Sequence, residues 1–168
     1  MSDTHLEIER RLLIRRPGAA LLRSLGGTVS RIRQDYLLAP EGVTDRVRSR
    51  TGAGGTVYTR TVKHRLTGMT REETEREIGE DEYKKALLCR DPALRTIEKD
   101  RWCIPFEGKT LEIDLFPFWT DRALLEVELS SEAEPFSLPA SIRVIRDVTE
   151  DRRYNNRGLA ASVPQEEI

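Results

Sequence analysis

The stretch LEIERRLL, from Leu6 to Leu13, alternates apolar and charged residues in the pattern of a β-strand. Side chains two residues apart on a strand point to the same face. Leu6 and Ile8 would therefore share one face, whereas Glu7, Glu9 and Arg11 would share the other. The segment predicts a strand with an apolar side and a side that carries two carboxylates followed by a cation.

The same spacing recurs along most of the chain. Pairs of like charges two residues apart lie in nearly every segment with strand character: Glu7/Glu9, Arg46/Arg48, Lys63/Arg65, Glu73/Glu75, Lys99/Arg101, Glu112/Asp114 and Glu126/Glu128. One interpretation is a half-buried sheet whose charged face is solvated, as in many antiparallel sheets. The other is a barrel with a charged interior, which the pairing of like charges and the scarcity of Ser and Thr favour. The residues alone leave both open.

Short turns separate the expected strands, which we place at 5–15, 28–38, 43–51, 55–65, 69–78, 94–106, 109–118, 122–130 and 142–151. GAGG at 52–55 and EGK at 107–109 predict hairpins. Short helices fit the segments from Pro17 to Gly26, from 79 to the stop at Pro92, and at 152–161.

These elements predict one domain over residues 1–168, with a barrel core at about 5–150, a C-terminal helix at about 152–161 and a loose tail at 162–168. The predicted fold class is mainly β (α+β). We expect an eight-stranded antiparallel β-barrel with helices packed on its outside.

The composition limits the classes of partner. The 28 Lys and Arg nearly cancel the 29 Asp and Glu, so the net charge of −1 argues against a general nucleic-acid-binding surface. Cys89 and Cys103 form no CxxC pair, and no run is long and apolar enough for a signal core or a membrane span. We expect a cytoplasmic protein, monomer or homodimer, with no membrane partner and no specific nucleic-acid partner.

A cavity that carried both signs of charge would suit one class of ligand. Arg and Lys pairs match phosphate oxygens, Arg through its planar fork. Clustered carboxylates suit a hard divalent cation such as Mg²⁺ or Mn²⁺. Acids and bases together therefore suggest a metal–polyphosphate site.

Several motifs in a fixed order carry a resemblance to a known family. Glu7-x-Glu9-x-Arg11 resembles its opening signature, E-x-E-x-K, and QDYLL resembles its Q-G-Y-L segment. RVR, TVK and EKDR are similar to its basic strands, and REETEREI, LEIDLF and LLEVELS to its acidic strands. DVTEDRRYNNRGLA resembles its ending, in which E-V-T is followed by D-x-R-Y-x-N and L-A. From Leu6 to about Ala160, the sequence resembles CYTH-domain proteins of the triphosphate tunnel metalloenzyme family.

The resemblance implies an eight-stranded antiparallel tunnel that binds a small-molecule triphosphate end-on with Mg²⁺ or Mn²⁺. Activities in the family include hydrolysis of inorganic tripolyphosphate, thiamine triphosphate and RNA 5′-triphosphate ends. We expect metal-dependent hydrolysis of tripolyphosphate. Two alternatives are a class IV adenylate cyclase, which makes cyclic AMP from ATP, and a polyphosphate- or nucleotide-binding module with weak or lost turnover.

Carried over motif by motif, the resemblance also implies roles for single residues. The implied metal ligands are Glu7, Glu9, Glu126, Glu128, Asp114 and Asp147. The implied phosphate-binding residues are Arg46, Arg48, Lys63, Arg65, Lys99 and Arg101. Tyr36 and Arg11 are implied catalytic residues that act on the attacking water. Glu73, Glu75 and Glu112 are expected as further tunnel acids.

Position 11 departs from the family pattern, because Arg11 stands where the family has Lys. Arg stays protonated in proteins, whereas Lys can shift its pKa and share in proton transfer. If the family Lys is a base or relay, Arg11 should impair hydrolysis. If that Lys only orients water or a phosphate oxygen, Arg11 can serve.

Overall fold

The structure is a computed structural model that describes residues 2–67 and 70–168. Its strands are β1 (Ser2–Arg15), β2 (Thr28–Tyr36), β3 (Val43–Gly52), β4 (Gly55–Arg65), β5 (Thr70–Ile78), β6 (Ile97–Phe106), β7 (Lys109–Leu115), β8 (Arg122–Glu128) and β9 (Val144–Asp147). Its α-helices are α1 (Ala19–Ser24), α2 (Glu80–Ala86) and α3 (Asn156–Ala161), and short 3₁₀ turns are η1 (Leu87–Cys89) and η2 (Arg152–Tyr154). The expected strand at 69–78 included Met69, which lies outside the described residues. None of the described helices is long and apolar enough to cross a membrane.

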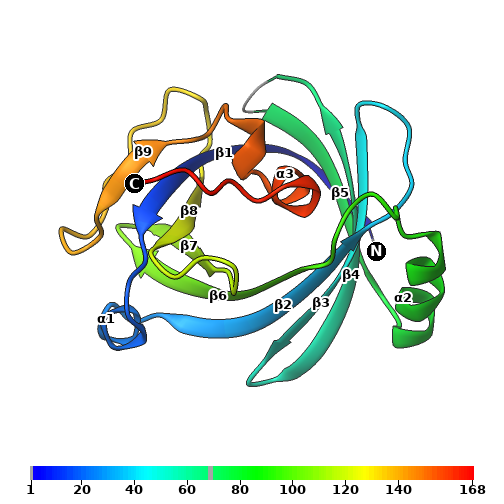
Figure 1. Cartoon of the computed structure of the whole chain (residues 1–168), viewed down its shortest axis with the longest axis horizontal. Helices are drawn as coiled ribbons and strands as arrows, with labels where there is room; N and C mark the ends of the chain where they lie inside the picture. Colours follow the sequence, from blue (N-terminus) through cyan, green and yellow to red (C-terminus); the bar gives the residue numbers. More distant parts are fainter. Residues whose placement is uncertain (1, 68–69) are drawn as a thin grey trace.

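Eight strands close into a ring in the order β1-β5-β4-β3-β2-β6-β7-β8, with every pairing antiparallel (Figure 1). Closure depends on the length of β1. Its first part, Ser2 to Ile8, pairs with β5, and its second part, Glu9 to Arg15, pairs with β8. The predicted eight-stranded antiparallel barrel is confirmed.

The expected strand at 142–151 is shorter than predicted and lies outside the ring. Only Val144–Asp147 forms β9, which pairs with Leu12 to Ile14 of β1. The hairpin between β6 and β7 is present where EGK predicted it. Its two turn residues, Glu107 and Gly108, have φ of 47° and 77°, the positive values that a tight turn between twisted strands requires.

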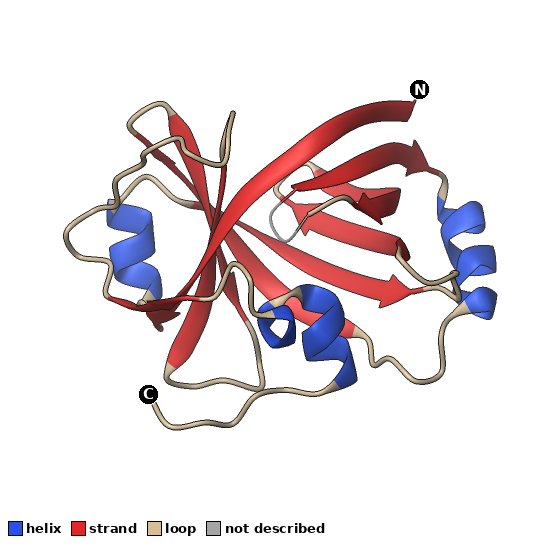
Figure 2. Ribbon diagram, turned by 90° about the horizontal axis from the view of Figure 1, so that it is seen from above, coloured by secondary structure: helices blue, strands red, loops and turns tan. Residues whose placement is uncertain are grey.

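The apolar side of the barrel strands faces outward and is covered by helices. On one side, Leu22 of α1 packs against a cluster that includes Trp102 and Ile113. On another side, Tyr83 of α2 packs against Val47 and Ile78. Figures 1 and 2 show α1 and α2 on opposite sides of the strands, as the sequence predicted for helices on the outside.

Helix α3 departs from that prediction, because it lies across one end of the ring (Figure 1). Its Leu159 and Ala160 pack against Leu13, Tyr36 and other buried residues of the strands. The expected helix at 152–161 is also interrupted at Asn155, whose backbone is extended and whose Oδ1 accepts a hydrogen bond from Gly158 N at 2.7 Å. Asn155 is therefore the N-cap of α3, and η2 is a separate turn.

Residues 162–168, which we expected to form a loose tail, make defined contacts with the barrel. Trp119 Nε1 donates to the carbonyl oxygen of Pro164 at 3.1 Å. Glu166 accepts from the Tyr154 hydroxyl at 2.7 Å through its carboxylate, and from Arg122 at 2.6 Å through its carbonyl oxygen. The tail therefore packs beside η2 and β8.

Candidate active site

The inner face of the barrel encloses two adjoining cavities. Cavity A has a volume of about 730 Å³ and extends toward the β6–β7 hairpin, with Gly108 and Lys109 in its lining. Cavity B has a volume of about 400 Å³ and lies at the end where α3 sits. They meet at residues that line both: Glu9, Arg11, Arg46, Lys63 and Asn156.

Cavity A is lined mainly by charge of both signs. Of the 21 described residues that line it, seven are acids and seven are cations, and none is aromatic. The acids are Glu7, Glu9, Glu73, Glu75, Glu112, Glu126 and Glu128, and the cations are Arg11, Arg46, Arg48, Arg50, Lys63, Arg101 and Lys109. The repeated charged pairs therefore point into the barrel, and the interpretation of a solvated outer face is wrong for them.

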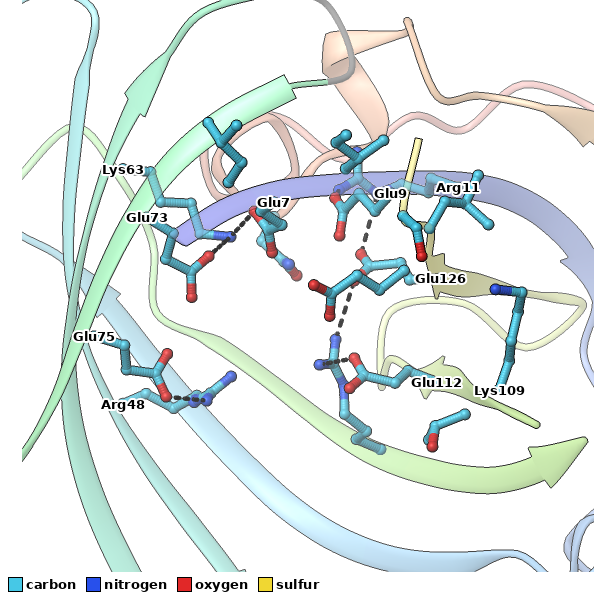
Figure 3. A pocket seen from close by; sticks show the side chains of 18 of the residues that line it. Glu7, Glu9, Arg11, Arg48, Lys63, Glu73, Glu75, Lys109, Glu112 and Glu126 are labelled. Atoms are coloured by element: carbon cyan, nitrogen blue, oxygen red, sulfur yellow. Dashed lines mark hydrogen bonds and ion pairs between the residues drawn. The ribbon is translucent and has the colours of Figure 1, made fainter. Parts of the chain in front are cut away.

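One side of cavity A is an acidic group that Arg11 holds together (Figure 3). Arg11 Nε donates to Glu126 at 3.0 Å, and its Nη2 donates to Glu9. Burial, followed by the charge of Glu126, raises the pKa of Glu9 to about 7 in spite of Arg11. Burial also opposes ionisation of Glu126, but the cations Arg11, Arg101 and Lys99 hold its pKa below its usual range. Negative charge at Glu9 is therefore not fully compensated.

The opposite side carries a complementary excess of positive charge. Lys63 Nζ is paired with Glu7 at 2.6 Å and with Glu73 at 2.8 Å, whereas Arg48 reaches Glu75 only at 3.6 Å. Burial, followed by the charges of Arg46 and Arg101, lowers the pKa of Arg48 to about 10.

Two donors on this side have no partner. The Nε atoms of Arg46 and Arg48 are buried, and neither has a hydrogen-bond partner among the described residues. Buried N–H groups of this kind are unfavourable until an acceptor reaches them. An anion with several oxygen atoms would supply both the acceptors and the missing negative charge.

The carboxylates of cavity A are suitable ligands for a divalent cation, although they are not grouped around one position. Within residues 2–67 and 70–168, no three Asp, Glu, His or Cys side chains are grouped to hold a metal ion. The carboxylates of Glu7, Glu9, Glu126 and Glu128 nevertheless line the same cavity, and carboxylate oxygen is the ligand that Mg²⁺ and Mn²⁺ prefer. The raised pKa of Glu9 indicates that more positive charge can be accommodated there.

Three of the expected site residues lie outside both cavities. Lys99 and Asp114 form a buried ion pair at 2.5 Å, and Arg101 donates twice to the same Asp114, at 2.7 Å each. The oxygens of Asp114 are thus used by two cations. Asp147 lies outside the barrel and pairs at 2.9 Å with Arg10, whose side chain points away from the interior. The interpretation of Lys99 as a phosphate contact, and of Asp114 and Asp147 as metal ligands, finds no support in these positions.

Two further expected residues line cavity B instead of cavity A. Arg65 is exposed, whereas Tyr36 is buried near Arg46 and Arg11. The Tyr36 hydroxyl accepts from Gln34 Nε2 at 3.1 Å. Burial raises the pKa of Tyr36, so the phenol stays protonated and can donate a hydrogen bond.

Among the residues that sequence reasoning missed in the lining of cavity A are two cations and one amide: Arg50, Lys109 and Asn156. Arg50 continues the two-residue spacing of Arg46 and Arg48, so the strand pattern contained the signal. Lys109 follows the hairpin turn, where strand alternation gives no direction. Asn156 reaches the interior only because α3 covers the end of the ring, and its Oδ1 accepts from Lys99 at 3.1 Å.

Comparison with known proteins gives a consistent assignment. No family model matches the chain. An inorganic triphosphatase from Nitrosomonas europaea is 35% identical over 138 residues, which are 79% of this chain and 85% of that protein. One from Acetivibrio thermocellus is 38% identical over 130 residues, 76% of this chain and 78% of that protein. A crystal structure of an inorganic triphosphatase matches with a TM-score of 0.57 and 30% identity, covering 94% of this chain and 96% of the other. With this similarity, and with eight antiparallel strands closed around paired acids and cations, the chain belongs to the CYTH-domain family of triphosphate tunnel metalloenzymes.

Proposed function

We propose that this protein hydrolyses inorganic tripolyphosphate in cavity A, with Mg²⁺ or Mn²⁺ as cofactor. The observation that carries the proposal is the lining of cavity A, whose described residues include seven acids and seven cations and no aromatic residue. Such a lining suits a compact, highly charged substrate with bound metal. The two curated relatives, both inorganic triphosphatases, support the same substrate.

We assign the phosphate contacts to the basic side of cavity A. Arg46 and Arg48 have the unfilled Nε donors. Burial, followed by repulsion from Arg46 and Arg101, lowers the pKa of Arg48, and an added anion would favour its charged form. Lys63 and Arg50 extend this side in both directions along the cavity. Charge-assisted hydrogen bonds from these groups would hold the phosphate chain and stabilise negative charge on the leaving diphosphate.

We assign the metal to the acidic side. Glu9, Glu126 and Glu128 would hold a divalent cation, together with Glu7, which pairs with Lys63 of the opposite side in the absence of metal. When bound, the cation would neutralise phosphate charge and polarise the scissile phosphoryl group. The facing acidic and basic sides of cavity A support a complex of metal and phosphate between them.

Arg11 and Tyr36 would orient the attacking water. Arg11 is held by two carboxylates, which raise its pKa against the effect of burial, so it is a fixed cation and not a proton acceptor. Tyr36 keeps its proton as well. Water would attack the terminal phosphorus in line, its proton would pass to a tunnel carboxylate, and the bond to the diphosphate would break.

Two alternative functions can be distinguished from tripolyphosphate hydrolysis by the experiment described below. A class IV adenylate cyclase needs a nucleoside pocket, and the apolar lining of cavity A consists only of Leu6, Ile8 and Leu129 among the described residues. A binding module without turnover would follow if a titratable Lys were required at position 11.

The test is phosphate release from tripolyphosphate, thiamine triphosphate and ATP, each with Mg²⁺, with Mn²⁺ and with a chelator, and with cyclic AMP measured in the ATP sample. We expect release from tripolyphosphate to be fastest and to stop with the chelator. Cyclic AMP as the main product would indicate the cyclase. Ligand-induced thermal stabilisation without phosphate release would indicate the binding module.

We further propose that residues 1–168 form a single domain that acts in the cytoplasm as a monomer or homodimer. Cys89 and Cys103 are free thiols, which suits a reducing compartment.

A further inference from the structure

We propose that Gln34 is a positioning residue for the reaction, because its amide fixes the direction in which the Tyr36 hydroxyl donates its proton. The proposal rests on the proposed function, in which Tyr36 orients the attacking water. It begins from the QDYLL motif, whose Tyr36 has an assigned role while its Gln34 has none. Gln34 lines neither cavity, so it would act on the water only through Tyr36.

Gln34 belongs to the inner face of β2. The strand register places Tyr36 opposite Arg46 and Gln34 opposite Arg48 of β3, and both arginines line cavity A. Residues directly opposite each other on neighbouring strands share a face, so Gln34 points inward. Its side chain is 0% exposed. Full burial is uncommon for Gln, and the polar atoms of a buried amide need partners.

The two ends of the Gln34 amide are used unequally. Its Nε2 donates to the hydroxyl oxygen of Tyr36 at 3.1 Å. Its Oε1 is buried and has no hydrogen-bond partner among the described residues. A buried acceptor without a partner is unfavourable, and an apolar side chain of similar size would avoid this cost. The hydrogen bond to Tyr36 is therefore what an amide supplies at this position and an apolar residue does not.

Donors approach the Tyr36 oxygen from two strands. Burial raises the pKa of Tyr36, and the charge and hydrogen bond of Arg46 act against this rise. Lys63 and Arg11, whose charges also act on Tyr36, are cations as well. A phenol has a single proton to donate. Because Gln34 and Arg46 both donate to the phenol oxygen, that proton is left for an acceptor that enters cavity B, which Tyr36 lines.

A change of the amide would redirect this proton. With Glu at position 34, the carboxylate would accept the Tyr36 proton and withdraw it from the water. With Met, the hydroxyl would lose the donor that fixes its rotation. Neither change removes a side chain that lines the cavities, so substrate binding should be affected less than turnover.

The test is kcat and KM for phosphate release from tripolyphosphate with Mg²⁺, measured for Gln34→Glu in the wild type and in Tyr36→Phe. Gln34→Glu keeps the shape of the side chain and replaces the donor by an acceptor. Gln34→Met, which removes the donor without adding charge, repeats the comparison. The control is Gln165→Glu, which adds the same charge at an exposed position.

We expect Gln34→Glu to lose about tenfold in kcat, with KM within about threefold of wild type. Gln34→Met should lose about fivefold in kcat. In Tyr36→Phe, either change should cost less than about twofold, because the hydroxyl through which Gln34 acts is absent. The control should keep kcat within about twofold of wild type.

A second measurement needs no turnover. In protein labelled with ¹³C at tyrosine Cζ, the chemical shift responds to the hydrogen bonds of the hydroxyl, and the Tyr36 resonance is the one that Tyr36→Phe lacks. This resonance should move in Gln34→Glu and stay in place in Gln165→Glu.

An equal loss of kcat in the wild type and in Tyr36→Phe would overturn the inference, since Gln34 would then act by a route that does not include the hydroxyl. Wild-type kcat in Gln34→Glu, or a Tyr36 resonance that does not move, would overturn it as well. Failure of the proposed function is distinct, because the wild type would then release no phosphate, whatever the Tyr36 resonance does.

Discussion

Replacing Glu9 with Gln removes a carboxylate that ionises with difficulty inside the barrel. The Glu9 residue is 9% exposed, and its pKa is raised from the usual 4.5 to about 7, mainly by burial and then by Glu126. The folded protein therefore binds this proton more tightly than the unfolded chain does. The contribution of protonated Glu9 to the free energy of unfolding is therefore fully present below pH 4.5 and is lost as the pH rises through 7.

The magnitude follows from the two pKa values. Moving from 4.5 to about 7 corresponds to about 3 kcal/mol, at about 1.4 kcal/mol for each pH unit. Gln has nearly the same volume and keeps an oxygen that can accept from Arg11, but it does not titrate. Relative to wild type, the free energy of unfolding of Glu9→Gln should therefore rise by about 3 kcal/mol between pH 4 and pH 8.5.

The assay is urea unfolding of both proteins across this range in buffer with a chelator, because a bound cation would itself shift the titration. Glu98→Gln, which removes an exposed carboxylate from the outer face of β6, controls for the loss of one negative charge. A difference between Glu9→Gln and wild type that stays constant with pH would show that folding does not raise the pKa of Glu9.

Three further predictions concern the basic side, position 11 and the closure by α3. Arg48→Met should weaken tripolyphosphate binding by tenfold or more in calorimetry. It should also raise the free energy of unfolding of the ligand-free protein, because burial and neighbouring cations disfavour the charge of Arg48. Unchanged affinity would contradict the role assigned to Arg48. Arg11→Lys should change the rate of phosphate release by less than about threefold if Arg11 is a fixed cation, with Arg31→Lys as control; a tenfold gain would show that a titratable amine limits turnover. Gly158→Ala should lower the free energy of unfolding by about 2 kcal/mol or more, because the added Cβ would lie 2.1 Å from the carbonyl oxygen of Arg152. The control is Gly18→Ala, where an added Cβ meets nothing within 4 Å. Equal stability of the two variants would count against the packing of α3.

Strand alternation predicted the charged interior because a closed barrel has only two faces. Apolar residues such as Ile113 and Val127 lie on the outer face, in the cluster that α1 covers. The residues that alternate with them on the same strands therefore face inward. Arg50 was predictable by the same rule. The family resemblance added the expectation that the charged interior binds a triphosphate with Mg²⁺ or Mn²⁺.

Alternation could not give the depth of a side chain along the barrel. Lys99 and Asp114 have the inward direction that their strands predict, but they are buried with each other beside the apolar cluster under α3. It also could not show that β9 pairs with β1 outside the ring, which places Asp147 beside Arg10. Both outcomes depend on contacts between segments far apart in the sequence.

Hydrolysis of tripolyphosphate by the charged inner face of the barrel would require the acids that line it. The most direct measurement is kcat/KM for phosphate release from tripolyphosphate with Mg²⁺, for wild type, Glu126→Gln and Glu98→Gln. Glu126 lies in the acidic group with Glu9 and Arg11, whereas Glu98 is exposed on the outer face of β6. We predict that Glu126→Gln loses about 100-fold or more in kcat/KM and that Glu98→Gln stays within about twofold of wild type. Equal activity of the two variants, or no phosphate release by the wild type, would contradict the claim.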